Sequence, residues 1–156
     1  MLIGVVSDTH NNLKNINQII SIFNKEAVDV VIHTGDIANA NALKNFSSLN
    51  AKLIGVYGNN DRNEIGLEEM AEKYSFDFEP PPKIIELFEK KIAIFHEPEL
   101  IEATLAENSD VVIVLHGHTH RYKEEHLNNT LIFNPGESAG MLKGKNAIGV
   151  IDLVSM

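Results

Sequence analysis

The chain has 156 residues, 44% of them hydrophobic, and its 22 acidic and 13 basic residues give a formal net charge of −9. That length suits one domain with a substantial core, so we expect a single domain over residues 1–156. Cysteine is absent, which excludes disulfides and thiolate metal sites and leaves His, Asp, Glu, Asn or water as metal ligands. The acidic excess and the lack of a Lys/Arg stripe argue against a nucleic-acid partner.

The sequence also lacks the features of a membrane or secreted protein. No basic segment and cleavage site follow Met1, and no apolar run approaches the ~20 residues that a spanning helix requires. We therefore expect a cytoplasmic location. A small anionic substrate remains compatible with the acidic total, because bound divalent cations make their surroundings locally positive.

The first half of the chain alternates strand-type and helix-type patterns. Three apolar runs are typical of buried strands: residues 2–7, 28–33 and 53–57. Three stretches between or after them have helical character: residues 13–27, 40–49 and 64–74. This βαβαβα order predicts a parallel sheet with right-handed crossovers.

The second half changes character after Pro80-Pro81-Pro82. Residues 84–88 and 92–96 predict a hairpin, residues 99–107 a helix and residues 111–116 a buried strand. Three further segments predict antiparallel strands: residues 125–127, 130–134 and 147–154. The expected fold class is α/β, with two packed mixed β-sheets flanked by helices in a four-layer α/β/β/α sandwich.

Polar motifs follow the ends of the predicted strands. They are Asp8-Thr9-His10, Gly35-Asp36, Gly58-Asn59-Asn60-Asp61, His96 and Gly117-His118-Thr119-His120. Parallel strands joined by βαβ units bring their carboxyl ends to one edge of the sheet, where such sheets place their ligands. The motifs therefore predict a single site built from five segments.

The spacing within the motifs suits a pair of metal ions. In an extended segment, residues i and i+2 point to the same side, so Asp8 and His10 would flank one site, as would His118 and His120. Two metals ~3.5–4 Å apart also need a bridging carboxylate, for which Asp36 is the natural candidate. Donors of this mixed kind, without sulfur, favour Mn, Fe, Ni, Co or Zn over Ca or Mg.

In this order and together, the five motifs resemble those of the calcineurin-like metallophosphoesterase superfamily, whose fold is the metallo-dependent phosphatase type. The short length, the Gly58-Asn59-Asn60-Asp61 variant and the run Asn134-Pro135-Gly136-Glu137 are similar to its small single-domain archaeal and bacterial phosphodiesterase branch. The resemblance extends from residue 3 to about residue 152. Each motif alone is weak evidence, whereas five in order at strand ends are strong evidence.

The resemblance implies a phosphoester hydrolase with two divalent metals. One metal would be held by Asp8, His10 and His120, and the other by Asn59, His96 and His118, with Asp36 shared. It further implies in-line attack on phosphorus by a hydroxide that bridges the metals, without a covalent intermediate. The expected substrate is a small phosphate ester.

Two departures from the family pattern refine this expectation. Many members carry a His where this chain has Asn60, and an amide cannot protonate a leaving alkoxide. Because a poor alkoxide leaving group is expelled more slowly without an acid, we favour phosphodiesters or activated esters over simple alkyl monoesters. Asp61 is expected to order the loop. Glu97 replaces the Gly that usually follows His96, and its side chain would crowd the second metal or bring an extra carboxylate toward it.

Alternative readings accompany these assignments. Asn59, Asn11 and Arg62 are candidate substrate-binding residues, although Asn11 also suits a helix cap and a lone Arg62 also suits an exposed surface. A non-catalytic protein-interaction scaffold of the same fold, as in one retromer subunit, is a rival function, but it predicts degraded ligand positions. A nuclease is the second rival, and the −9 charge argues against it. A homodimer is compatible with the sequence, which identifies no interface.

Overall fold

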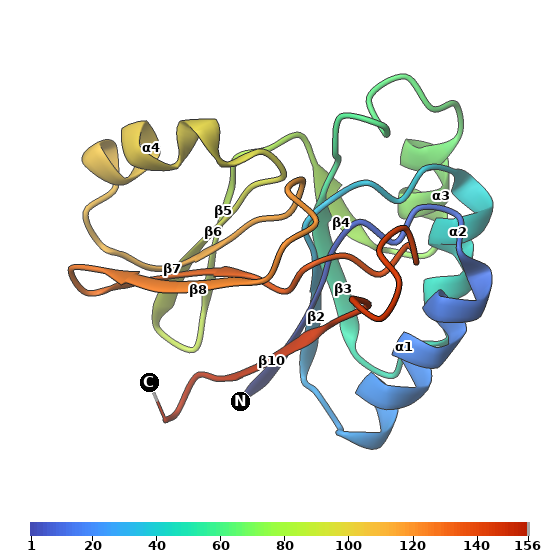
Figure 1. Cartoon of the computed structure of the whole chain (residues 1–156), viewed down its shortest axis with the longest axis horizontal. Helices are drawn as coiled ribbons and strands as arrows, with labels where there is room; N and C mark the ends of the chain where they lie inside the picture. The colour runs from blue at the N-terminus through green and yellow to red at the C-terminus, as the bar shows by residue number, and fades with distance from the viewer. Residues whose placement is uncertain (156) are drawn as a thin grey trace.

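The computed structural model describes residues 1–155 and consists of two five-stranded sheets packed face to face (Figure 1). The first sheet has the strand order β10-β1-β2-β3-β4. Its strands are β1 (Leu2–Val6), β2 (Val30–His33), β3 (Lys52–Val56), β4 (Asp77–Glu79) and β10 (Gly149–Asp152). Strands β1 to β4 pair in parallel and β10 pairs with β1 in antiparallel fashion, so the sheet is mixed.

The second sheet has the order β5-β6-β7-β9-β8. Its strands are β5 (Lys83–Leu87), β6 (Lys90–Ile94), β7 (Val111–Leu115), β8 (Lys123–Leu127) and β9 (Thr130–Asn134). The pairs β6–β7 and β7–β9 are parallel, whereas β5–β6 and β8–β9 are antiparallel hairpins. The second sheet is therefore mixed as well.

Helices cover the outer face of each sheet (Figure 1). The first sheet is covered by α1 (Leu13–Lys25), α2 (Ala40–Asn45) and α3 (Leu67–Lys73), and the second by α4 (Ile101–Glu107). Short 3₁₀ turns follow α2 at Phe46–Ser48 and precede α4 at Pro98–Leu100. Helix α1 begins where the Asn12 side chain accepts a hydrogen bond from the Asn15 amide, the usual function of an N-cap residue. No helix within residues 1–155 is long and apolar enough to cross a membrane.

Three apolar layers hold this arrangement together. One lies between the first sheet and α1 to α3, and includes Phe23, Leu43 and Phe46. The second joins the inner faces of the two sheets, and the third packs α4 onto the second sheet. Alternate residues of β1 show the division, because Ile3 and Val5 face the second sheet while Val6 faces the helices.

The predicted fold class is confirmed, and the differences are local. The helix predicted over residues 64–74 begins only at Leu67, because residues 61–66 form a loop that ends in left-handed Gly66. The helix predicted over residues 40–49 ends as α-helix at Asn45. Strand β4 was not predicted, since Asp77–Glu79 is too short and too polar to give an apolar run.

Candidate metal centre

The structure gathers all seven sequence-predicted metal ligands where strands of both sheets end. Loops after β1, β2 and β3 supply donors from the first sheet, and loops after β6 and β7 supply donors from the second. The seven residues are Asp8, His10, Asp36, Asn59, His96, His118 and His120. The site thus lies at the junction of the two sheets, and neither sheet alone would form it.

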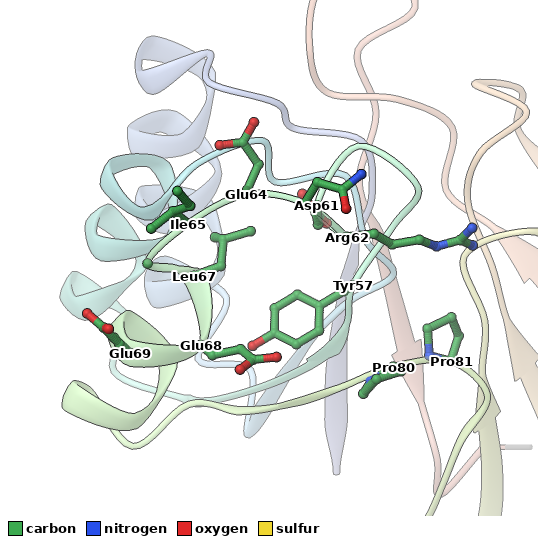
Figure 2. Close-up of a pocket in the computed structure, with 12 residues that line it drawn as sticks. Tyr57, Asp61, Arg62, Glu64, Ile65, Leu67, Glu68, Glu69, Pro80 and Pro81 are labelled. Carbon is green, nitrogen blue, oxygen red and sulfur yellow. The ribbon is translucent and has the colours of Figure 1, made fainter.

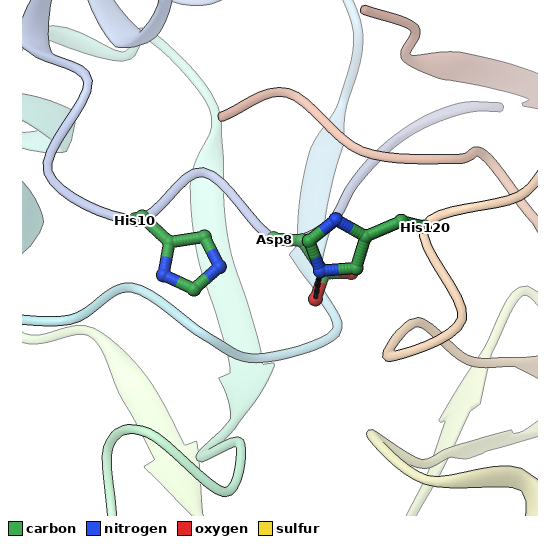
Figure 3. A group of neighbouring side chains, drawn as sticks. All are labelled: Asp8, His10 and His120. Atoms are coloured by element: carbon green, nitrogen blue, oxygen red, sulfur yellow. Dashed lines mark ion pairs between the residues drawn. The ribbon is translucent and has the colours of Figure 1, made fainter. Parts of the chain in front are cut away.

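Asp8, His10 and His120 form one group of donors (Figure 3). One potential ligand atom from each lies within 4.8 Å of the others. Asp8 Oδ1 is 3.3 Å from His120 Nε2, and the two imidazole centroids are 5.9 Å apart. Donor atoms this close to one another could bind one shared cation.

Asp36 connects this group to a second one. Its Oδ2 lies 3.8 Å from His10 Nε2, and its Oδ1 lies 3.4 Å from His96 Nε2. His96 Nε2 is in turn 2.9 Å from Asn59 Oδ1, which is 3.1 Å from His118 Nδ1. The two carboxylate oxygens of Asp36 therefore face the two halves of the site.

Buried polar atoms without partners test whether a cation fits here. Among residues 1–155, four buried side-chain atoms have no hydrogen-bond partner: Asp8 Oδ1, His10 Nε2, Thr34 Oγ1 and His116 Nε2. Two of these atoms belong to the first donor group. A buried polar atom without a hydrogen-bond partner costs about 1–3 kcal/mol, so the presence of such atoms in both Asp8 and His10 indicates that the two side chains fit a shared cation.

The pKa values of the cluster indicate the same preference for positive charge. Burial raises the pKa of Asp8, and the imidazoles of His96 and His120 offset this only in part. Burial also acts to raise the pKa of Asp36, but the close approach of His96 and two hydrogen bonds from Asn60 outweigh it and lower that pKa. Burial lowers the pKa of His96, yet the facing carboxylates of Asp36 and Asp8 raise it overall. Positive charge beside these carboxylates is therefore stabilised.

The backbone at five of the seven donors is left-handed, with φ of 49° at Asp8, 45° at His10, 60° at Asp36, 66° at His118 and 57° at His120. The prediction of extended i and i+2 pairs was therefore wrong in its local geometry. Asp8 and His10 do lie in one group of donors, whereas His118 and His120 lie in different groups. A left-handed backbone is uncommon outside glycine and concentrates at functional sites.

Two glycines allow the loops to approach this closely. A Cβ on Gly58 would lie 2.2 Å from Asp36 Oδ1, and a Cβ on Gly117 would lie 2.0 Å from Ser7 Oγ and 2.7 Å from Asp8 Oδ2. All three distances are far below van der Waals contact, so no other residue fits without displacing the carboxylates or the Ser7 hydroxyl. Glycine at these two positions therefore has a steric cause.

Asp61 and Asn60 brace the loop that carries Asp36. The Asp61 carboxylate accepts hydrogen bonds at 2.8 Å from four backbone amides, those of Asp36, Ile37, Ala38 and Gly58. Asn60 donates to Asp36 twice, from its backbone amide at 3.0 Å and from Nδ2 at 2.7 Å. The side chain at position 60 thus binds the central carboxylate of the site.

The other residues predicted to belong to the site lie at the edge of the donor cluster. The Arg62 guanidinium donates to both oxygens of Glu97, at 2.6 and 2.8 Å, so the Glu97 carboxylate points toward Arg62. Asn11 is exposed in the turn before α1, and Asn12 makes the cap. The predicted contact of Arg62 with a phosphate would require it to share its guanidinium with Glu97.

Several supporting residues escaped the sequence reasoning. Ser7 Oγ donates a short hydrogen bond to Asp8 Oδ2. His33 accepts from the Gly35 amide through Nδ1 at 3.1 Å, which leaves Nε2 to donate to Thr9 Oγ1 at 2.9 Å. Ser7 and Thr9 adjoin Asp8 in sequence, and this was the available signal.

Comparisons with known proteins agree with this geometry. The family model described as a calcineurin-like phosphoesterase superfamily domain matches residues 1–156. The chain is 38% identical over 154 residues to phosphodiesterase MJ0936 of Methanocaldococcus jannaschii, which covers 97% of this chain and 93% of that protein.

Solved structures share the fold. One described as a novel archaeal phosphodiesterase superposes with a TM-score of 0.89 at 36% identity, over 99% of this chain and 95% of that one. Vps29 of Entamoeba histolytica, solved with Zn²⁺, gives a TM-score of 0.72 at 18% identity, over 98% and 86% of the chains, and supports the fold alone. The whole-length family match and the archaeal relative place this chain in the calcineurin-like phosphoesterase superfamily.

Proposed function

We propose that the protein is a phosphodiesterase that uses two divalent metal ions. Membership of the superfamily makes the chain a metal-dependent phosphoric ester hydrolase. One observation above all supports two metals rather than one: the oxygens of Asp36 face different imidazoles, His10 at 3.8 Å and His96 at 3.4 Å. A carboxylate so placed suits a bridge between neighbouring cations.

In this proposal the donors divide between two metal positions. Asp8, His10 and His120 hold one cation, whereas Asn59, His96 and His118 hold the other, with Asp36 shared. Bound metals of this kind lower the pKa of water to about 7 and polarise phosphoryl oxygens, so no Ser or Cys nucleophile is required. A carboxylate oxygen of Asp8 also lies within 4.8 Å of potential ligand atoms of Asp36 and His96. The Asp8 carboxylate is therefore close to both proposed metal positions.

The residues around the proposed metals position the metal ligands and orient the substrate. Asp36 is the proposed catalytic residue shared by the two metals. Asn60 holds its carboxylate in place, and Asp61 holds its backbone amide. Asn59, Asn11 and Arg62 are proposed to contact the substrate. Asn59 is the best placed of the three, because its Oδ1 already lies between His96 and His118.

Asn60 supports a diester rather than an alkyl monoester as substrate. General acid catalysis typically contributes 10²–10⁴-fold to rate, and an amide supplies none of it. An alkyl monoester with a poor leaving group loses most from this deficit. Diesters with better leaving groups lose less, which also agrees with the activity for which the archaeal relative is named.

Other features of the chain support finer proposals. The nitrogen and oxygen donors favour Mn, Ni, Fe, Co or Zn as the metal. The net charge of −9 supports a small phosphate ester over a nucleic acid and so disfavours a nuclease. A complete donor set disfavours a purely non-catalytic scaffold. A single domain, a cytoplasmic location and a homodimer remain predictions from the sequence.

A hydrolysis panel tests the proposal. Metal-free protein is reconstituted with each candidate metal and assayed on monoesters, diesters, cyclic nucleotides and DNA, beside Asp36→Ala. We expect metal-dependent diester hydrolysis that Asp36→Ala abolishes. Unchanged activity in Asp36→Ala would overturn the bridging role, and failure to bind any metal would favour the scaffold.

A further inference from the structure

A hollow of about 390 Å³ adjoins the second half of the metal centre. His118, a proposed ligand, forms part of its wall, so the hollow lies directly beside the proposed metal centre. Pro81, Pro82 and Leu100 supply apolar surface around it, and the Leu100 side chain is 57% exposed. A ligand in this hollow would therefore contact both apolar surface and the metal site.

A second hollow lies beside this one and shares with it the side chain of Arg62, which pairs with Glu97 in the wall of the first hollow. Arg62 and Pro81 line both, and the second has a volume of about 590 Å³ (Figure 2). Figure 2 shows Arg62 extending away from Leu67, at the edge of the second hollow. The wall of the second hollow contains none of the seven proposed metal ligands. Only the smaller of the two hollows thus reaches the metal centre directly.

Charge and shape limit what the smaller hollow accepts. Glu97 is neutralised by Arg62 at 2.6 Å, whereas Glu99 adds a further acid to the wall. An anionic group would be repelled there, and an uncharged one would bury apolar surface against Leu100 and the prolines. Small-ligand sites commonly begin at about 300 Å³, so one or two rings fit.

The geometry points to this hollow as the subsite for an uncharged aryl or nucleoside-type substituent of the phosphodiester, bounded by the Arg62–Glu97 pair. This subsite rests on the proposed phosphodiesterase function and adds a substrate class to it. Arg62 and Glu97 then act together as a wall that directs the substituent toward Leu100.

The first test compares matched variants on the metal-loaded enzyme. Leu100→Asp places a charge in the smaller hollow, and Ile65→Asp places the same charge in the larger one, at a side chain that is 94% exposed. With bis(4-nitrophenyl) phosphate, we expect Leu100→Asp to lower kcat/KM about fivefold, mainly through KM, and Ile65→Asp to leave it unchanged. Thermal unfolding of both variants confirms that they remain folded.

The second test isolates the aryl group from the phosphate. The affinities for phenyl phosphate and for inorganic phosphate are measured by competitive inhibition in wild type, Leu100→Asp and Leu100→Lys. For each protein, the affinity for phenyl phosphate is divided by the affinity for inorganic phosphate. We expect both substitutions to reduce the ratio, because each removes the apolar surface of Leu100 against which the ring would be buried. A ratio that rises in Leu100→Lys would overturn the assignment of an uncharged substituent.

The outcomes separate the two proposals. An active wild type with an unaffected Leu100→Asp, or with an equal loss in Ile65→Asp, overturns the subsite and leaves the phosphodiesterase function standing. A metal-loaded wild type that hydrolyses none of the diesters overturns both.

Discussion

The carboxylate of Asp61 accepts a hydrogen bond at 2.8 Å from the backbone amide of Asp36, the central donor of the proposed metal site. Three more amides, those of Ile37, Ala38 and Gly58, donate to the same carboxylate at the same distance. One buried side chain thus fixes the loops after β2 and β3 relative to each other. Asp36 is therefore held by residues that need not touch a metal or a substrate.

Replacing this acceptor weakens both the fold and the metal site. Asp61→Asn turns an amide group toward N–H donors and removes the charge, so we expect a loss of about 2–3 kcal/mol in the free energy of unfolding. Metal affinity should fall about tenfold or more, since supporting residues of this kind commonly contribute 10–100-fold. Urea unfolding of metal-free protein and metal titration measure the two effects. Glu64→Gln, an exposed acid in the same loop, serves as the control and should change neither.

Adding a proton donor at position 60 should broaden the substrate range. Asn60→His supplies the missing acid, and we expect alkyl monoester turnover to rise at least tenfold, within the range of general acid catalysis. Asn60→Ala removes the same Nδ2 hydrogen bond to Asp36 without supplying an acid. If Asn60→His is no faster than Asn60→Ala on monoesters, the absence of an acid does not explain the preference.

His33 should make stability depend on pH. Burial lowers the pKa of His33 to about 3, whereas the unfolded chain has the ordinary value near 6.5. Between these values the unfolded chain binds a proton that the folded protein excludes. The free energy of unfolding should therefore fall as the pH drops from 6.5 toward 3, by up to about 1.4 kcal/mol per pH unit from this residue.

The matching measurement is a series of urea unfolding curves on metal-free protein. His33→Gln keeps an acceptor for Gly35 and a donor for Thr9 but does not titrate, so its pH slope should be shallower than that of wild type. His126→Gln, on exposed strand β8, should retain the wild-type slope. An equal slope in His33→Gln and wild type would contradict the prediction.

Metal binding should stabilise the protein through Asp36. A metal at 100 times its dissociation constant adds about 2.7 kcal/mol per site, which a thermal shift detects readily. Asp36→Asn keeps the size of the side chain and loses the charge, so most of this shift should disappear. Asp29→Asn, an exposed position, should behave as wild type. The stoichiometry, measured by metal analysis, should be two per chain in wild type.

Sequence reasoning predicted the fold correctly because the fold depends on local patterns, and the same patterns underlie the proposed donor set. Buried strands such as Val111–Leu115 are unbroken apolar runs, and parallel strands place their carboxyl ends at a common edge. The Arg62–Glu97 pair was missed because its partners are 35 residues apart and meet across the two sheets. The left-handed backbone at Asp8 and His10 was missed for a related reason, since tertiary contacts impose it against the intrinsic preference of each residue.

The left-handed backbone at the donor positions also limits how this site can change. Asn and Gly adopt that conformation readily, whereas β-branched residues do so at considerable cost. An exchange of His118 for Gly would remove a proposed metal ligand without straining the backbone. Exchange for Val or Ile would distort the loop as well. Metal binding can thus be lost in a single step while the surface that surrounds it keeps its shape.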